Sequence, residues 1–144
     1  YEISNHARPG SESRHNLVYW RYGAFLGVGP GAHGRILSGG RLLATATEKN
    51  PESWRASVAA RGEGLVAADP VAAAEQAEEY LVMALRLAEG LDAARYERLG
   101  GRALDAARLA ALEAEGLIAR TGTRLAATPR GRLVLNALAA ELAR

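Results

Sequence analysis

Apolar residues recur at helical spacing through the second half of the chain. One stripe falls at the i, i+4, i+7, i+8 and i+11 positions that share a helix face, and it consists of Ala77, Leu81, Ala84, Leu85 and Ala88. Shorter helices are predicted over residues 92–99 and 104–115. The pattern therefore predicts a mainly helical region after residue 69.

Three pairs of a capping residue and proline mark where helices are expected to begin. Asn50-Pro51, Asp69-Pro70 and Thr128-Pro129 place a side-chain acceptor before a proline, and proline lacks the amide that the first turn leaves unpaired. These pairs predict helix starts near residues 51, 70 and 129. Gly62 and Gly90 are expected to end the first two helices.

Short apolar runs bounded by turn residues predict strands. Residues 1–4 look like a strand separated from a larger sheet, and residues 24–28 have the pattern of a buried strand. Residues 36–43 predict a hairpin around Gly39-Gly40, and residues 117–127 predict another around Thr121-Gly122-Thr123. Helices followed by this second hairpin and a closing helix are typical of a winged-helix-like arrangement.

The expected fold class is thus α+β, with a partial sheet followed by a helical domain that carries a hairpin wing. The domain division expected from the sequence is 1–47 for the sheet, 48–68 for a connecting helix and linker, and 69–144 for the helical domain. The chain has 144 residues, which is enough to bury a real core. It opens at Tyr1 without a methionine, so we expect a fragment whose amino-terminal part is missing.

Composition limits the kinds of functional site that the chain can contain. The chain has no cysteine, which excludes disulfides, thiolate nucleophiles and cysteine-bound iron–sulfur clusters within it and fits a reducing cytoplasm. No apolar run approaches the roughly 18 residues needed to span a membrane. Residues 1–62 and 116–144 each carry a net charge of +4, whereas residues 63–115 carry −6.

The densest group of candidate functional residues lies in residues 14–21. If this segment is helical, His15 and Tyr19 share a face, and imidazole is a common axial ligand of haem iron. Tyr19 and Trp20 would supply flat apolar walls, and arginines could pair with propionates: Arg8, Arg14 and Arg21. Alternatively, His15 bonds a strand edge while the aromatic residues cap a core, and the residues alone favour this second arrangement.

A glycine-rich turn follows at residues 29–34. It satisfies the G-x-G-x-x-G pattern, but a dinucleotide site needs a helix directly afterwards, and here a hairpin is expected. The turn either brings its backbone close to a ligand or is purely structural.

The predicted wing raises a nucleic-acid alternative. Its neighbourhood carries four arginines suited to phosphates: Arg120, Arg124, Arg130 and Arg132. The helix that would enter a groove offers Asp105, Glu113 and Glu115 against Arg108 alone, and these carboxylates would repel the phosphates. Nucleic-acid binding is therefore the weaker hypothesis.

Nearly the whole chain resembles the carboxyl-terminal part of HemW-type proteins, which are radical S-adenosylmethionine relatives of oxygen-independent coproporphyrinogen III oxidase. The resemblance is strongest over residues 1–34. Its matching segments are Tyr1-Glu2-Ile3-Ser4-Asn5, Ala7-Arg8-Pro9-Gly10, Ser13-Arg14-His15-Asn16, Tyr19-Trp20, Leu26-Gly27-Val28-Gly29-Pro30-Gly31-Ala32-His33, Leu85-Arg86-Leu87, Glu89-Gly90-Leu91, Gly116-Leu117 and Arg130-Gly131-Arg132-Leu133-Val134-Leu135-Asn136.

The resemblance implies that residues 1–47 are the tail end of a partial TIM-like barrel. The family's H-N-x-x-Y-W motif is associated with haem binding, and it falls on His15, Asn16, Tyr19 and Trp20, with His15 as the implied iron ligand. Gly27, Gly29 and Gly31 would lie at the ligand-bearing end of the barrel, near S-adenosylmethionine. The family usually has phenylalanine at position 6, so His6 adds a second imidazole that competes with His15 as the iron contact.

The resemblance also implies a parent protein that carries a 4Fe-4S cluster and S-adenosylmethionine. The three cluster cysteines lie upstream in the family and are absent here, so this chain should be inactive alone. We expect it to bind haem or a porphyrinogen in the cytoplasm, with the amino-terminal barrel and haem-accepting proteins as partners. The competing hypothesis is a winged-helix module that binds nucleic acid or protein.

Overall fold

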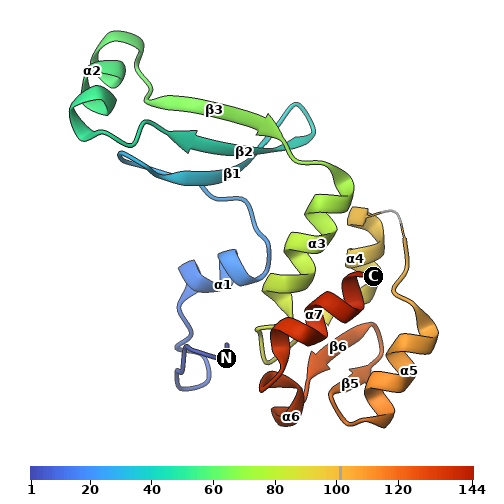
Figure 1. The fold of residues 1–144 in the computed structure, drawn as a ribbon. Coiled ribbons are helices and arrows are strands. Elements are labelled where there is room, and N and C mark those ends of the chain that lie inside the picture. Colours follow the sequence, from blue (N-terminus) through green and yellow to red (C-terminus); the bar gives the residue numbers. More distant parts are fainter. Residues whose placement is uncertain (101) are drawn as a thin grey trace. The chain divides into compact units, whose positions relative to one another are not determined.

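The computed structural model describes residues 1–100 and 102–144 and divides the chain into two compact units (Figure 1). The first unit joins residues 1–22 to residues 73–144, and the second comprises residues 23–72. Each unit contains a small antiparallel sheet of three strands, so the fold is mixed α/β. The division into 1–47, 48–68 and 69–144 stays a prediction.

The first unit surrounds one central helix. Helix α3 contacts α1, α4 and α7, and the sheet has the strand order β4-β6-β5. The elements of this unit are α1 (Arg14–Trp20), α3 (Ala73–Ala84), β4 (Leu91–Asp92), α4 (Ala93–Gly100), α5 (Ala106–Ala114), β5 (Ile118–Thr121), β6 (Arg124–Ala127), α6 (Pro129–Arg132) and α7 (Leu135–Ala143).

The core of the first unit follows the predicted apolar stripe. Ala77, Leu81, Ala84 and Leu85 are buried, and Leu81 is fully enclosed. Ala88 is exposed, because α3 ends at Ala84 and the helical spacing no longer directs a residue four positions further along toward the core. Burying these side chains supplies the main stabilisation of α3, since short helices are marginal without tertiary packing.

The predicted wing is a β-hairpin that leads into a divided terminal helix. Gly122 has φ 59°, as the tight turn between β5 and β6 requires. The Thr128 hydroxyl accepts a hydrogen bond from the Gly131 amide at 3.1 Å and so caps α6, as the Thr128-Pro129 pair predicts. The helix then breaks at residues 133–134 before α7.

The second unit contains the hairpin β1 (His33–Ser38) and β2 (Arg41–Thr47), then α2 (Pro51–Arg61) and β3 (Leu65–Pro70). Gly39 and Gly40 have φ values of 56° and 75°, which confirms the predicted turn. Asn50 caps α2 by accepting from the Ser53 amide at 3.0 Å, and Gly62 ends it in the left-handed conformation.

The helix start predicted at residue 70 is wrong. Asp69 and Pro70 lie in β3, where they pair with Ala44 and Leu43, and α3 begins only at Ala73. Strand β3 is at the edge of the sheet, where a proline without an amide donor is tolerated. Gly90 likewise follows α3 by several residues; its φ of 68° belongs to the turn before β4.

Neither of the two early strands forms as predicted. Residues 1–4 make only isolated bridges, in which Glu2 pairs with Asn5 and Leu87. In residues 24–28 only Phe25 is bridged, to Arg35, and Leu26 and Val28 are 77% and 86% exposed. A segment bridged at a single point gains little burial, so its outward side chains remain in solvent.

None of the described helices is long and apolar enough to cross a membrane.

Candidate functional site

Helix α1 carries five of the candidate residues, namely Arg14, His15, Asn16, Tyr19 and Trp20. The Ser13 hydroxyl caps the helix by accepting from the Asn16 amide at 3.3 Å. The resulting helical spacing brings the His15 and Tyr19 rings edge to face, with their centroids 5.6 Å apart. The His15 side chain is exposed, whereas Tyr19 and Trp20 are half-buried. Both arrangements expected from the sequence, a ligand site and a cap on the core, stay predictions.

A hollow of about 310 Å³ lies beside α1 in the first unit. It is lined by Asn5, His15, Asn16, Tyr19 and Trp20, so the four residues of the H-N-x-x-Y-W motif meet at one place. The volume lies at the small end of ligand pockets, which span about 300–1,000 Å³. A hollow of this size fits the edge of a large flat molecule or the whole of a small one.

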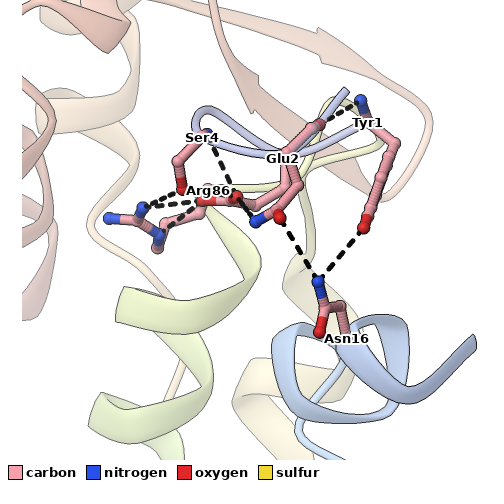
Figure 2. A network of polar contacts seen from close by, with 6 residues as sticks. Tyr1, Glu2, Ser4, Asn16 and Arg86 are labelled. Atoms are coloured by element: carbon pink, nitrogen blue, oxygen red, sulfur yellow. Dashed lines mark hydrogen bonds and ion pairs between the residues drawn. The ribbon is translucent and has the colours of Figure 1, made fainter. Parts of the chain in front are cut away.

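Asn16 faces inward, toward residues at the start of the chain. Its side-chain amide donates to the Tyr1 hydroxyl at 3.2 Å and to the Asn5 Oδ1 at 3.3 Å (Figure 2). The two bonds use both of its amide hydrogens. Asn16 therefore fixes α1 against residues 1–5 more than it offers a donor to a ligand.

Glu2 is the buried charge of this site. Its carboxylate accepts from the Ser4 amide at 3.0 Å, the Ser4 hydroxyl at 2.8 Å and the Asn5 amide group at 2.6 Å (Figure 2). Burial raises the pKa of the Glu2 carboxyl, but the hydrogen bonds from Asn5, Ser4 and Arg86 outweigh it and lower that pKa to about 2. Glu2 is thus ionised at any physiological pH.

Arg86 balances the Glu2 charge from just beyond the end of α3. Its Nε donates to Oε1 of Glu2 at 2.8 Å, and its Nη2 lies 2.6 Å from the same oxygen. The guanidinium also lies over the Trp20 ring, 4.6 Å from its centroid. Backbone pairing sets this arrangement, since the Ile3 amide donates to the Arg86 carbonyl at 3.2 Å.

The sequence does not predict Glu2, Asn5 or Arg86 as site residues. Arg86 lies far from α1 along the chain, and no periodic pattern joins the two. The signal available was the resemblance, because Glu2, Asn5 and Arg86 all fall within its matching segments.

The arginines near α1 have different partners. Arg21 forms a two-pronged pair with Glu89, at 2.8 and 2.7 Å, and its hydrogen bond lowers the pKa of the Glu89 carboxyl. Arg14 is exposed, and its side chain makes no hydrogen bond or ion pair with the described residues. Of these two, Arg14 is therefore the one available to a ligand carboxylate.

The three candidate glycines belong to the second unit, and each has a conformational or packing reason to be glycine. Gly29 and Gly31 have φ values of 101° and 71°. A Cβ on Gly27 would collide with the backbone of His33. The Thr47 hydroxyl holds the turn by donating to the Gly29 carbonyl at 2.6 Å. These contacts account for a structural turn, and the role of the three glycines beside a ligand stays a prediction.

No metal-binding cluster is found among residues 1–100 and 102–144, where no three His, Cys, Asp or Glu side chains converge. His6 and His33 are both exposed and lie outside the hollow beside α1. Among the residues that line this hollow, His15 is the one that offers an imidazole to an iron.

The arginines of the wing are partly neutralised. Arg120 pairs with Glu113 of α5 at 2.6 Å, and this hydrogen bond lowers the pKa of the Glu113 carboxyl. Asp105 caps α5 by accepting from the Arg108 amide at 2.8 Å. Two of the acidic groups that weigh against nucleic-acid binding thus have structural roles, and nothing in the hairpin adds support to that alternative.

Comparison with known proteins shows what the chain is similar to. Residues 71–134 match the HemN C-terminal domain. The chain is 37% identical over 142 residues to the heme chaperone HemW of Mycobacterium tuberculosis, a match that covers 99% of this chain and 34% of that protein. It is 31% identical over 141 residues to the heme chaperone HemW of Escherichia coli. The chain spans about a third of the length of these curated relatives.

Two further matches extend the similarity. Radical S-adenosyl methionine domain-containing protein 1, mitochondrial, of Bos taurus is 42% identical over 95 residues, which cover 63% of this chain and 22% of that protein. The solved structure of coproporphyrinogen III oxidase (HemN) from Escherichia coli, a radical SAM enzyme, superposes with a TM-score of 0.61 at 20% identity, covering 94% of this chain and 35% of the other. Residues 71–134 are thus a HemN C-terminal domain, and the chain is a relative of the HemW proteins along nearly its whole length.

Proposed function

We propose that this chain contributes a haem-binding surface to a HemW-like haem chaperone. The observation that carries the proposal is the hollow beside α1, which is lined by the four residues of the H-N-x-x-Y-W motif. Similarity to proteins named heme chaperone over 99% of the chain supports the same function. The chaperone is preferred to a porphyrinogen oxidase because relatives that are 37% and 31% identical over nearly the whole chain are named heme chaperone.

The residues of the hollow fit one edge of haem. Bound haem would supply an iron that accepts an imidazole nitrogen, and the exposed His15 ring is the group placed to provide it. Tyr19 and Trp20 present flat rings suited to an apolar macrocycle. Arg14, which has no partner among the described residues, can pair with a propionate. The chain's own contribution is therefore binding and orientation.

The remaining parts of the function belong to a longer protein. The 4Fe-4S cluster would be held by residues outside this chain, which contains no cysteine. Within the proposal, residues 1–47 complete a TIM-like barrel, with Gly27, Gly29 and Gly31 near S-adenosylmethionine. Residues 69–144 form a winged-helix-like domain, and haem-accepting proteins are partners in the cytoplasm.

Haem titration of the purified protein tests the proposal. We expect His15→Ala to weaken binding at least tenfold and to shift the Soret band, because the substitution removes the iron ligand. His6→Ala and His33→Ala are matched controls, since both remove exposed imidazoles outside the hollow, and they should bind as wild type does.

Equal haem affinity and an unchanged Soret band in the His15→Ala protein would overturn the proposal. If His6→Ala weakened binding instead, the iron ligand would be the second imidazole, and the hollow beside α1 would lose its role.

A further inference from the structure

We infer that Glu2 and Arg86 are positioning residues that hold the binding residues of α1 in place. The inference rests on the proposed function, and it adds two residues that touch no ligand in that proposal. Both lie outside α1: Glu2 at the start of the chain, and Arg86 just after α3 (Figure 2).

The carboxylate of Glu2 is buried and gathers several donors around it. The Glu2 side chain is 0% exposed, and that of Arg86 is 26% exposed. A buried carboxylate is costly unless it is fully hydrogen-bonded, and here donors from Ser4, Asn5 and Arg86 surround it. Replacing the carboxylate by an amide would turn one of its two acceptor oxygens into a donor group, so the donors that meet that oxygen would lose their acceptor and the surrounding side chains would have to rearrange.

One connection runs from Glu2 through Asn5 to α1. The Asn5 Nδ2 donates to Glu2 at 2.6 Å, so the other side of the same amide, Oδ1, is turned toward Asn16. Asn16 donates to that oxygen at 3.3 Å and is the chain neighbour of His15. Glu2 therefore selects the orientation of the Asn5 amide, and the Asn5 amide sets how α1 is rotated about its axis.

The second connection runs from Glu2 through Arg86 to Trp20. Glu2 holds the guanidinium by Nε at 2.8 Å and by Nη2 at 2.6 Å, which fixes its plane. The guanidinium then covers one face of the Trp20 ring, at 4.6 Å from the centroid. A lysine would keep the charge but could not reproduce the flat stacking and the paired donors.

Two variants separate positioning from simple stability. Glu2→Gln keeps the shape and removes the charge, and Arg86→Lys keeps the charge and removes the planar group. We expect each to weaken haem binding about tenfold and to shift the Soret band, as substitutions in the outer shell of a metal site commonly do. Glu113→Gln is the matched control, because it breaks another arginine pair of 2.6 Å that lies away from α1.

Trp20 fluorescence gives a readout that needs no haem. The chain has two tryptophans, so a Trp54→Phe background leaves Trp20 as its single tryptophan, which is excited selectively at wavelengths that the tyrosines do not absorb. We expect Glu2→Gln and Arg86→Lys to increase quenching of Trp20 by acrylamide, because the ring face covered by Arg86 opens to solvent. Glu113→Gln should leave the quenching unchanged even where it lowers the melting temperature.

The outcomes distinguish this inference from the proposed function. If His15→Ala weakens haem binding while folded Glu2→Gln and Arg86→Lys proteins bind as wild type does, the inference is overturned and the function stands. If His15→Ala has no effect, the function fails. Unchanged Trp20 quenching in Arg86→Lys overturns the inference whatever the haem result, and this conservative variant serves even if Glu2→Gln does not fold.

Discussion

At the scale of single residues, local spacing predicted which side chains meet but not what holds them. His15 and Tyr19 lie four residues apart, so helical geometry alone predicted their contact. Glu2 and Arg86 are separated by more than half the chain, and no spacing rule joins them. Their pairing depends on backbone bonds between residues 1–3 and 86–88, such as that from the Ala88 amide to the Tyr1 carbonyl at 2.9 Å.

Acid titration of stability should reveal the Glu2 network. A carboxyl whose folded pKa of about 2 lies below its unfolded value of about 4.3 contributes stability that is present above the unfolded value and is lost as the pH falls toward 2. We expect Glu2→Gln to lower the free energy of unfolding by roughly 3 kcal/mol at pH 7, with a smaller difference at each step below pH 4.5. Denaturant unfolding of both proteins between pH 7 and pH 2.5 measures this difference, and a gap independent of pH would contradict the assignment.

At the scale of elements, the predictions succeeded where a turn or a cap is closed by neighbouring residues. Two turns and one helix cap are specified by residues within a few positions of one another: the turns at Gly39-Gly40 and Gly122, and the cap at Asn50. The local sequence is therefore enough to predict them. Asp69-Pro70 carries the same local signal as Asn50-Pro51 but lies in β3, because pairing with β2 outweighs the local preference. The strand predicted at residues 24–28 does not form, because this segment lacks the pairing that keeps Asp69 and Pro70 in β3. It has a single bridge, from Phe25 to Arg35.

The contact between α6 and the hairpin gives a test at this scale. Gly131 packs so closely against the Leu117 carbonyl that a Cβ there would collide with it. We expect Gly131→Ala to cost about 2–4 kcal/mol of stability, because backbone rather than a flexible side chain must move. Gly39→Asn is the control: it has open space around it and a φ of 56° that asparagine tolerates. Similar melting temperatures for Gly131→Ala and wild type would show that α6 can shift without cost.

At the scale of the whole molecule, the sequence predicted that sheet-forming and helical residues would segregate. It did not predict that residues 1–22 would join residues 73–144, because contacts between the two ends of a chain leave no periodic trace. The mixture of helices and antiparallel strands was therefore accessible from periodicity, whereas the membership of each compact unit was not.

Separate stability of the two units is a measurable consequence. Leu81 is fully buried in the first unit, so Leu81→Ala should destabilise that unit by about 2–5 kcal/mol. We expect amide hydrogen exchange to accelerate in α3 and α7 while the amides of β1 and β2 keep their wild-type rates. An equal acceleration in both units would show that they unfold as one cooperative body.

The discontinuous make-up of the first unit determines how the chain can be divided for experiments. A piece trimmed to residues 71–134 would lose Leu138 and Leu142, which are buried, and would deprive Arg86 of its carboxylate. The segment that matches the HemN C-terminal domain is thus shorter than the set of residues that folds as the first unit. Anyone expressing this region to study ligand capture should begin upstream of Glu2 and continue through α7.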